Sequence, residues 1–172
     1  GSAEQPPTIK NPFTVLERSG IIQSAVRNHC IDDRRSYGLL RVRSVRDQPY
    51  NDAKWLQSVQ EMVQRECVDS DSVAIVGSDR DDSTWYLKAF PQWEQDLRPP
   101  VYEGLSGTDL RDNLFSQHFY AEDWRRYTPE TVVSFLKAFV ASESYRALRE
   151  EAQFISDYKL SWSRAPYPPI FV

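Results

Sequence analysis

The sequence predicts an α/β fold with a parallel sheet, followed by a C-terminal helical extension. Residues 39–45 and 72–77 have the short alternating or β-branched patterns of strands. Segments with helical spacing of apolar residues lie before, between and after them, most plainly at residues 52–67. Strands that alternate with helices favour a parallel sheet, because parallel neighbours must be joined by a crossover. Further helical patterns within residues 128–164 predict the extension.

The length and charge of the chain limit what it can be. Its 172 residues and 20.0 kDa suffice for one domain with its own core, with or without a helical extension. No apolar run approaches the length that crosses a membrane and no charged-then-apolar leader opens the chain, so a cytoplasmic location is expected. The net charge of -4 argues against a nucleic-acid surface, which needs clustered Lys and Arg. We therefore expect neither a nucleic-acid nor a membrane partner.

The two cysteines, Cys30 and Cys67, predict neither a metal site nor a disulfide framework. They lack a second pair, and no histidine lies nearby at ligand spacing. We interpret both as packing residues or free thiols.

Helix starts are expected at four positions with local capping signals. Thr14 and Glu17 have the spacing of a capping box, in which two side chains satisfy each other's backbone N–H groups. The apolar face that follows is expected to comprise Val15, Ile22, Ala25 and Val26. The other expected caps are Asp52, Thr128 with Pro129 as the first helical residue, and Ser142.

The two C-terminal helices are predicted to be structural. The buried face of the first is expected to contain Val132, Val133, Leu136 and Phe139. The second has apolar residues spaced in threes, fours and a seven: Tyr145, Leu148, Ala152, Ile155 and Trp162. We expect no chemistry from it, because its charged residues have the pattern of a solvated face.

The clearest strand is residues 72–77, a β-branched run closed by Gly77. Such runs are typical of strands buried on both faces of a parallel sheet. Ligands of open parallel sheets bind beyond the carboxyl ends of the strands. The residues after Gly77 are therefore candidates for a binding site.

Residues 105–111 predict an anion site at the start of a helix. Extended character at residues 101–104 gives way to helical spacing from Leu110, and the first N–H groups of a helix have no internal partner. Ser106 and Thr108 add hydroxyls, and Arg111 adds a forked cation one turn later. The alternative is that Ser106 only caps the helix, with Asp109 closing a weak capping box. The spacing alone leaves both interpretations open.

The pattern Ser106-x-Thr108-x-x-Arg111 resembles the Ser-x-Thr-x-x-Arg signature of nicotinamide mononucleotide (NMN) adenylyltransferases. The resemblance implies that the hydroxyls and the arginine hold the triphosphate of ATP. Residues 11–18, Asn-Pro-Phe-Thr-x-x-Glu-Arg, resemble a second block of that family, whose preceding basic residue faces the phosphates. That residue is Lys10 here. The family more often has arginine, so a bidentate contact becomes a point charge.

Residues 77–93 are the longest match. They resemble the Gly-His-x-Lys-Asp-x-Ser-x-Tyr-Tyr-Leu-x-x-Phe-Pro-Gln-Trp run of NMN adenylyltransferases that are fused to a Nudix hydrolase. Ser78 replaces the usual histidine, and Arg80 stands where lysine is common. The alternative is a loop capped by Asp82 or Ser83 that enters a short helix.

The same resemblance implies a pocket for the nicotinamide ring. In the family an aspartate a few residues ahead of a polar residue and a tryptophan lines that pocket, which points here to Asp47, Asn51 or Asp52, and Trp55, together with Gly77 and Arg80. A core aromatic at helical spacing is an equal alternative for Trp55.

Taken over the whole chain, the resemblance implies a Rossmann-like nucleotidyltransferase. Such an enzyme transfers AMP from ATP to NMN with Mg2+, giving NAD and pyrophosphate, with Lys10 and Arg111 in catalytic positions.

The expected parts are a nucleotidyltransferase domain at residues 1–127, C-terminal helices at 128–164, and a linker at 165–172 toward a Nudix domain. A catalytically silent nucleotide-binding or structural module is the alternative. The sequence leaves open whether the protein forms a homo-oligomer and whether NMN or its deamidated acid is preferred.

One family feature is missing from residues 1–172. His29 and His118 do not form the His-x-Gly-His pair with which the family stabilises the transferring phosphoryl group. We expect that pair to belong to a strand and loop ahead of Gly1, so residues 1–172 alone are expected to be inactive. No Nudix box is present either, because Arg149, Glu150 and Glu151 lack the flanking glycine and the later Glu-Glu pair.

Overall fold

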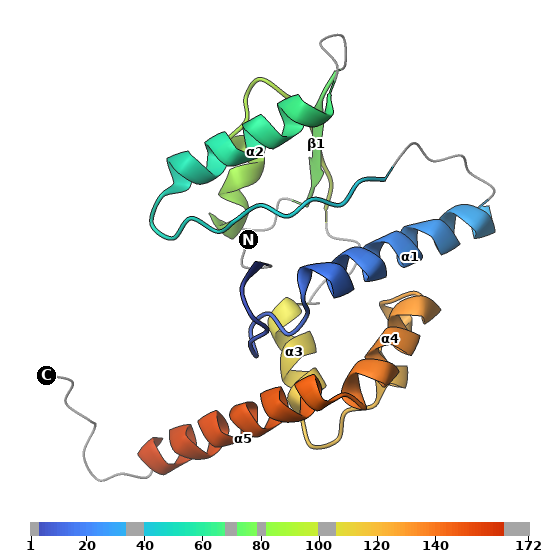
Figure 1. The fold of residues 1–172 in the computed structure, drawn as a ribbon, viewed down its shortest axis with the longest axis vertical. Coiled ribbons are helices and arrows are strands. Elements are labelled where there is room, and N and C mark those ends of the chain that lie inside the picture. Colours follow the sequence, from blue (N-terminus) through green and yellow to red (C-terminus); the bar gives the residue numbers. More distant parts are fainter. Residues whose placement is uncertain (1–3, 34–39, 68–71, 79–81, 100–105, 164–172) are drawn as a thin grey trace, which may run out of the picture. The chain divides into compact units, whose positions relative to one another are not determined.

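The computed structural model describes residues 4–33, 40–67, 72–78, 82–99 and 106–163 (Figure 1). The chain forms two compact units. The first consists of Gly1 and Val45–Leu105, and the second of Ser2–Ser44 and Ser106–Val172. Within the ranges just given, no helix is both long and apolar enough to span a bilayer.

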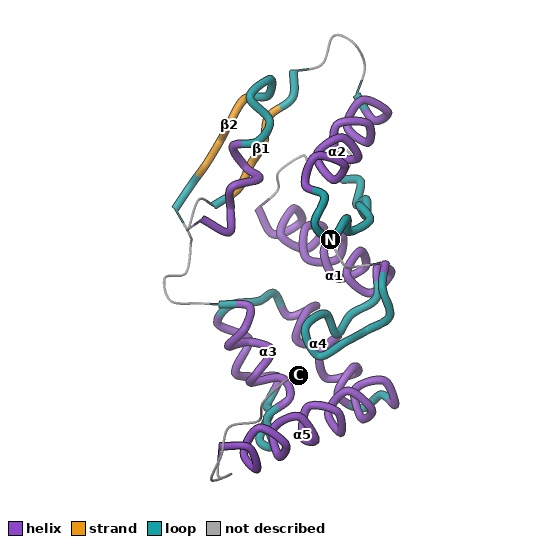
Figure 2. The backbone as a smooth tube through the Cα atoms, turned by 90° about the vertical axis from the view of Figure 1, so that its left-hand side faces the viewer, coloured by secondary structure: helices purple, strands orange, loops and turns teal. Residues whose placement is uncertain are grey.

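The first unit contains a helix and a small parallel sheet. Its elements are α2 (Asp52–Glu66), β1 (Ala74–Gly77), the 3-10 helix η2 (Asp82–Lys88) and β2 (Glu94–Leu97). Figure 2 shows β1 and β2 side by side, and their pairing is parallel from Ala74 opposite Glu94 to Gly77 opposite Leu97. The expected parallel sheet is thus confirmed, as is the short helix that follows the loop after Gly77.

The expectation that β1 is buried on both faces is wrong. Ile75 is half-buried, but Ala74 is exposed and Val76 is 70% exposed. Side chains of a strand alternate between the two faces of its sheet, and only one face of β1 is covered within this unit. On that face Gly77 lies against Leu87 of η2, and a Cβ at Gly77 would come 2.7 Å from the Leu87 Cδ2. The absence of a side chain at Gly77 is what permits this close packing.

The predicted strand at residues 39–45 is also wrong. Residue 39 lies outside the described ranges, and residues 40–48 form no strand. Val42 is half-buried between the exposed Arg41 and Arg43, so the alternating pattern does produce alternating burial. Alternation of polar and apolar residues predicts alternating burial, but it does not by itself establish the ladder of backbone hydrogen bonds that defines a strand.

The cap of α2 differs by one residue from the prediction. The Asn51 side chain, and not that of Asp52, accepts the backbone N–H of Lys54 at 3.0 Å. Tyr50 precedes it with φ 61°, a left-handed conformation that turns the chain into the helix. Asp52 is the first helical residue, where its negative charge favours the positive end of the helix dipole.

The second unit is helical. It contains α1 (Val15–Asp33), α3 (Gly107–Phe115), the 3-10 helix η3 (Ala121–Arg126), α4 (Glu130–Val140) and α5 (Glu143–Ser163). Its buried core is supplied by Leu114, Ala121, Trp124, Val133, Leu136, Phe139, Tyr145 and Leu148. The predicted buried face of α4 is therefore confirmed, with Val132 packed at the edge of the same core.

The predicted capping box of α1 is confirmed. The Thr14 N–H donates to the Glu17 Oε2 at 2.7 Å, and the Glu17 N–H donates to the Thr14 Oγ1 at 3.2 Å. The predicted apolar face is realised only in part. Val15, Ala25 and Val26 are half-buried, but Ile22 is 45% exposed.

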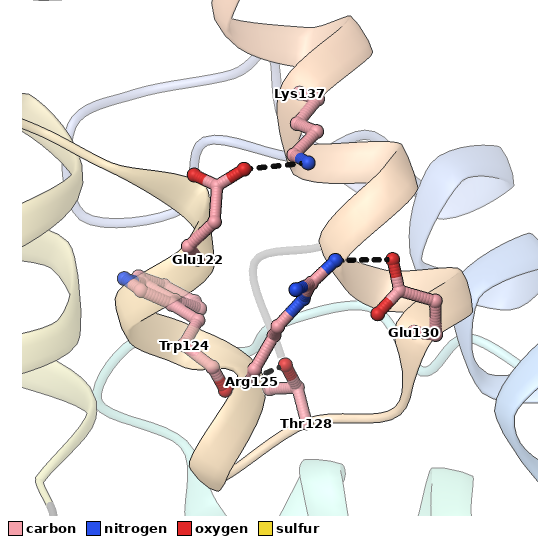
Figure 3. Close-up of polar contacts among 6 residues, drawn as sticks. All are labelled: Glu122, Trp124, Arg125, Thr128, Glu130 and Lys137. Atoms are coloured by element: carbon pink, nitrogen blue, oxygen red, sulfur yellow. Dashed lines mark hydrogen bonds and ion pairs between the residues drawn. The ribbon is translucent and has the colours of Figure 1, made fainter.

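The start of α4 also lies one residue later than predicted. Pro129 is the cap residue and Glu130 is the first helical residue. The Thr128 hydroxyl instead donates to the Trp124 carbonyl at 2.9 Å, so it closes η3 (Figure 3). The Trp124 carbonyl thus takes the hydroxyl that was expected to cap α4. Residue spacing alone does not reveal this competing partner.

Two exposed ion pairs join η3 to α4 in Figure 3. Lys137 lies 2.6 Å from Glu122, and Arg125 lies 3.1 Å from Glu130. The hydrogen bond from Lys137 lowers the pKa of the Glu122 carboxyl. Exposed pairs of this kind contribute little to stability, so the apolar core carries most of the packing energy.

A buried hydrogen bond fixes α5 to α3. The Tyr145 hydroxyl donates to the Leu114 carbonyl at 2.9 Å, and the Tyr145 ring stacks on Phe115 with centroids 5.8 Å apart. Burial raises the pKa of the Tyr145 phenol. The Ser142 hydroxyl accepts the Tyr145 N–H at 3.1 Å, which confirms Ser142 as the opening residue of α5.

Candidate functional site

A cavity of about 630 Å³ lies within the second unit. Three elements line it: the loop before α1, the helix α3 and the C-terminal half of α5. The lining residues are Ile9, Lys10, Thr108, Arg111, Asp112, Phe115, Ala152, Gln153, Ile155, Ser156 and Lys159. Three of the four residues predicted for the phosphates, Lys10, Thr108 and Arg111, therefore share one cavity.

The fourth, Ser106, caps α3 and does not line the cavity. Its hydroxyl oxygen accepts the Asp109 N–H at 3.0 Å, and the hydroxyl donates to the Asp109 Oδ2 at 2.6 Å. The capping interpretation of Ser106 is confirmed by this geometry. Its local effect is to hold the first turn of α3 in place, with the unpaired N–H groups of that turn at the helix start.

The Arg111 side chain folds back over that first turn. One guanidinium nitrogen donates to the Thr108 Oγ1 at 3.1 Å, and a Cβ built on Gly107 would lie 3.1 Å from the Arg111 Nη1. A guanidinium has five N–H donors in a rigid fork, so a bond to Thr108 leaves most of its donors for a ligand. Thr108 therefore orients a cation at the N-terminus of α3, the positive end of the helix.

Lys10 lies in a braced loop. The backbones of Thr8 and Asn11 form two mutual hydrogen bonds of 3.0 Å. From the first turn of α1, Arg18 donates to the Phe13 carbonyl and to the Asn11 Oδ1, both at 3.1 Å. These bonds fix the backbone on either side of Lys10, whose own side chain is exposed.

The residues of α5 were missed by the sequence prediction, which assigned no chemistry to this helix. Five of them line the cavity, among them Gln153, Ser156 and Lys159. The sequence signal that could have identified them is their helical spacing relative to the apolar residues of α5. Ser156 and Lys159 continue the helical stripe of Leu148, Ala152 and Ile155, which is buried at its start and exposed from Ile155 onward.

The cavity is more positive than the protein as a whole. Its lining includes three cations, Lys10, Arg111 and Lys159, and a single carboxylate, Asp112. The whole chain has a formal net charge of -4. A local excess of cations beside a helix N-terminus, with apolar walls formed by residues such as Phe115, is suited to a ligand with several negative charges.

The described residues contain no group of three or more His, Cys, Asp or Glu that could hold a metal ion. Cys67 is a half-buried free thiol. The side chain of Cys30 lies outside the described part of the chain. The expectation that the two cysteines build no metal site therefore stays a prediction.

The residues predicted for the nicotinamide ring belong to the first unit, and Arg80 lies outside the described residues. Asp47 is exposed, Asn51 caps α2 and Gly77 packs against Leu87. These contacts account for Asn51 and Gly77 structurally, whether or not they also touch a ligand.

Trp55 lies in the first turn of α2 within an aromatic cluster. Its ring is edge-on to Tyr86, with centroids 6.1 Å apart, and it also contacts the buried Phe90 at 6.5 Å. Phe90 in turn stacks on Trp93 at 4.6 Å. The half-buried indole thus packs as a core aromatic on one side, and its exposed part remains available to a ligand.

The chain is similar to known proteins in sequence and in fold. No family model matches it. It is 30% identical over 151 residues to the nicotinamide/nicotinic acid mononucleotide adenylyltransferase of Acinetobacter baylyi, an alignment that covers 88% of this chain and 74% of the relative.

Its fold is similar to the crystal structure of a bifunctional NMN adenylyltransferase/ADP ribose pyrophosphatase from Francisella tularensis. The TM-score is 0.76 at 25% identity, and the match covers 96% of this chain and 47% of the other. The form complexed with AMP and a manganese ion gives a TM-score of 0.72 at 24% identity, covering 96% and 46%. The chain thus spans about half the length of these solved chains. The similarity confirms the predicted Rossmann-like α/β fold.

Proposed function

Because the chain belongs to the family of nicotinamide/nicotinic acid mononucleotide adenylyltransferases, we propose that it transfers AMP from ATP to NMN, giving NAD and pyrophosphate. The observation that carries this proposal is the cavity that Lys10, Thr108 and Arg111 share. Family membership supplies the reaction, and the cavity supplies a place for the triphosphate. The name of the relative includes nicotinic acid mononucleotide, so the deamidated acid is a second candidate acceptor.

We propose that the triphosphate lies at the N-terminus of α3. The Arg111 fork matches two phosphate oxygens at once, whereas Lys10 contributes a compact charge from the opposite loop. The Thr108 hydroxyl and the unpaired backbone N–H groups of the first turn add neutral donors. Asp112 is the one acidic group in the cavity lining.

The proposed chemistry is a direct displacement. A phosphate oxygen of NMN forms a bond to the α-phosphorus of ATP, and the bond from that phosphorus to its bridging oxygen breaks. The bridging oxygen takes the electron pair and leaves as part of pyrophosphate. No covalent intermediate with the protein is required, since positioning and charge neutralisation lower the barrier of such transfers.

A divalent ion fits this proposal as a companion of ATP. Sites of this type commonly hold Mg2+ through one or two carboxylates together with the phosphates of the substrate, and Asp112 is the carboxylate in the cavity that would serve. When bound, the ion adds positive charge at the phosphate oxygens. Lys10 and Arg111 would also neutralise the phosphate charge, and they would orient the triphosphate.

The expected result of the direct test is ATP binding together with product formation. Calorimetric titration with ATP and Mg2+ should show saturable binding, and incubation of the intact gene product with NMN and ATP should yield NAD and pyrophosphate in equal amounts. Absence of both would refute the proposal. ATP binding by the intact gene product without any NAD would instead favour a catalytically silent nucleotide-binding module.

We further propose that the pyridine ring of NMN is bound in the first unit by Asp47, Asn51 or Asp52, Trp55, Gly77 and Arg80. The support is the resemblance of these segments to the family and the half-buried position of Trp55. A pyridinium on the face of an indole gains a cation–π contact in addition to stacking.

Trp55→Phe is expected to weaken NMN binding about two- to fivefold, because a smaller ring loses about 0.5–1 kcal/mol of cation–π and stacking energy. The measurement is the NMN dissociation constant by calorimetry. Trp162→Phe in α5 is a matched control and should leave the constant unchanged. Equal affinity in wild type and Trp55→Phe would assign Trp55 to packing alone.

Two further features of the protein are proposed on the same basis. The similarity to bifunctional enzymes supports residues 1–127 as the nucleotidyltransferase domain, 128–164 as its C-terminal helices and 165–172 as a linker to an ADP-ribose pyrophosphatase of the Nudix type. The use of ATP and NMN supports a cytoplasmic location. The codons that follow Val172 in the gene test the first of these proposals.

A further inference from the structure

We propose that α5 is part of the ATP site and that Lys159 binds the polyphosphate of the nucleotide as its third cation. This assignment rests on the proposed function and extends it to a helix that carries no recognised motif of the family. Lys159 lines the same cavity as Lys10, Thr108 and Arg111.

The rotation of α5 is set by buried contacts at its start. Tyr145 and Leu148 are 4% and 6% exposed, and the Tyr145 hydroxyl bonds to the Leu114 carbonyl of α3 at 2.9 Å. From Leu148 the same stripe continues through Ala152 and Ile155 to Lys159, in steps of four, three and four residues. Lys159 therefore continues the stripe that begins at these buried residues and, although itself exposed, lines the cavity together with residues of α3.

Lys159 lines the same cavity as residues from both ends of α3. Tyr145, near the start of α5, contacts Leu114, near the end of α3. Lys159, near the end of α5, shares a cavity with Thr108, near the start of α3. Figure 1 shows α5 crossing the C-terminal end of α3, and the cavity beside this crossing is lined by residues of both helices.

The charges in the cavity are poorly compensated without a ligand. Among the described residues, neither Lys10 nor Lys159 forms an ion pair, and Asp112 is the one carboxylate beside three cations. Like charges gathered at the positive end of a helix repel one another, and a polyanion relieves that repulsion.

The wall around Lys159 strengthens its attraction for an anion. Ile9, Phe115, Ala152 and Ile155 supply apolar surface beside the cations. Ser156, one turn before Lys159, adds a hydroxyl donor. Charges next to apolar walls are screened less than those in open water, so one lysine here contributes more than one on a flat surface.

The occupant is a polyphosphate and not the nucleoside. A lysine presents a compact charge without the planar fork that matches a base or a single carboxylate. Its contribution should therefore grow with the number of phosphates, from AMP through ADP to ATP. That dependence distinguishes a direct phosphate contact from a structural role of Lys159.

The test is the affinity of Lys159→Gln for ATP and AMP, measured by calorimetry on the full chain at two salt concentrations. ATP affinity is expected to fall about five- to tenfold, within the range for a charged contact at an accessible site, with AMP affinity changed less than about twofold. The salt dependence of ATP binding should also become weaker, because one fewer cation takes part. Lys159→Arg should restore ATP affinity.

Matched controls separate this inference from the proposed function. Lys137→Gln removes the same charge from an exposed position in α4 and should leave ATP affinity unchanged. Unchanged ATP affinity in Lys159→Gln, with loss of binding in Arg111→Ala, would overturn the role of Lys159 and leave the proposed function intact. An equal loss for ATP and AMP would assign Lys159 a structural role. Failure of the wild-type chain to bind ATP would overturn both.

Discussion

Arg111→Ala is expected to weaken ATP binding by about 1.5–3 kcal/mol, the range for hydrogen bonds to a charged group, or about ten- to 150-fold in the dissociation constant. The guanidinium is the strongest donor group in the cavity, and Thr108 orients it at the N-terminus of α3. Its removal leaves phosphate oxygens without a bidentate partner. Calorimetric titration with ATP and Mg2+ measures the change directly.

Arg125→Ala is the matched control for this variant. Arg125 is exposed and pairs with Glu130 away from the cavity, so the same loss of charge should leave ATP affinity unchanged. Lys10→Ala should act in the same direction as Arg111→Ala but less strongly, because it removes a point charge and not a fork. Unchanged ATP affinity and unchanged turnover in Arg111→Ala would remove Arg111 from the site.

Leu114→Ala is expected to lower the free energy of unfolding by about 2–5 kcal/mol, the range for truncation of a fully buried leucine. Leu114 is 0% exposed at the centre of the helical core, and its carbonyl accepts the Tyr145 hydroxyl. Leu114 anchors α3, which carries Thr108 and Arg111. Loss of this packing should therefore also make the positions of the two cavity residues less well defined. Chemical denaturation followed by circular dichroism gives the free energy.

A leucine outside the core provides the comparison. Leu16 is 84% exposed in α1, so Leu16→Ala should change the free energy of unfolding by less than about 0.5 kcal/mol. Equal stability of Leu114→Ala and wild type would mean that α3 is not held by this core. A destabilised Leu114→Ala that still binds ATP with full affinity would show that the cavity does not depend on the core.

The extended match at residues 77–93 indicates the family from the sequence alone, and the similarity to the Acinetobacter baylyi enzyme confirms that family. The specificity of this match comes from many side chains in fixed order, which chance does not reproduce. Lys10 and Arg111 are supported by the cavity that they share, whereas the assignment of the nicotinamide residues stays a prediction.

The sequence by itself determined features that depend on residues within one turn of each other. The capping box of Thr14 and Glu17 and the buried stripe of α4 were predicted correctly, and capping by Ser106 was one of the two interpretations left open. In each case the partners are three or four positions apart. The β-branched run closed by Gly77 likewise identified β1, although not how well the strand would be covered.

Only the tertiary structure decided which helix faces meet. The pattern of residues 39–45 predicted a strand that residues 40–45 do not form, and Val76 is exposed because one face of its sheet is open. Lys159 joins a cavity with Lys10, which lies near the other end of the chain, through the packing of α5 against α3. Helical spacing shows that a stripe exists, but the contact that orients it, here Tyr145 on Leu114, is long-range and leaves no local pattern.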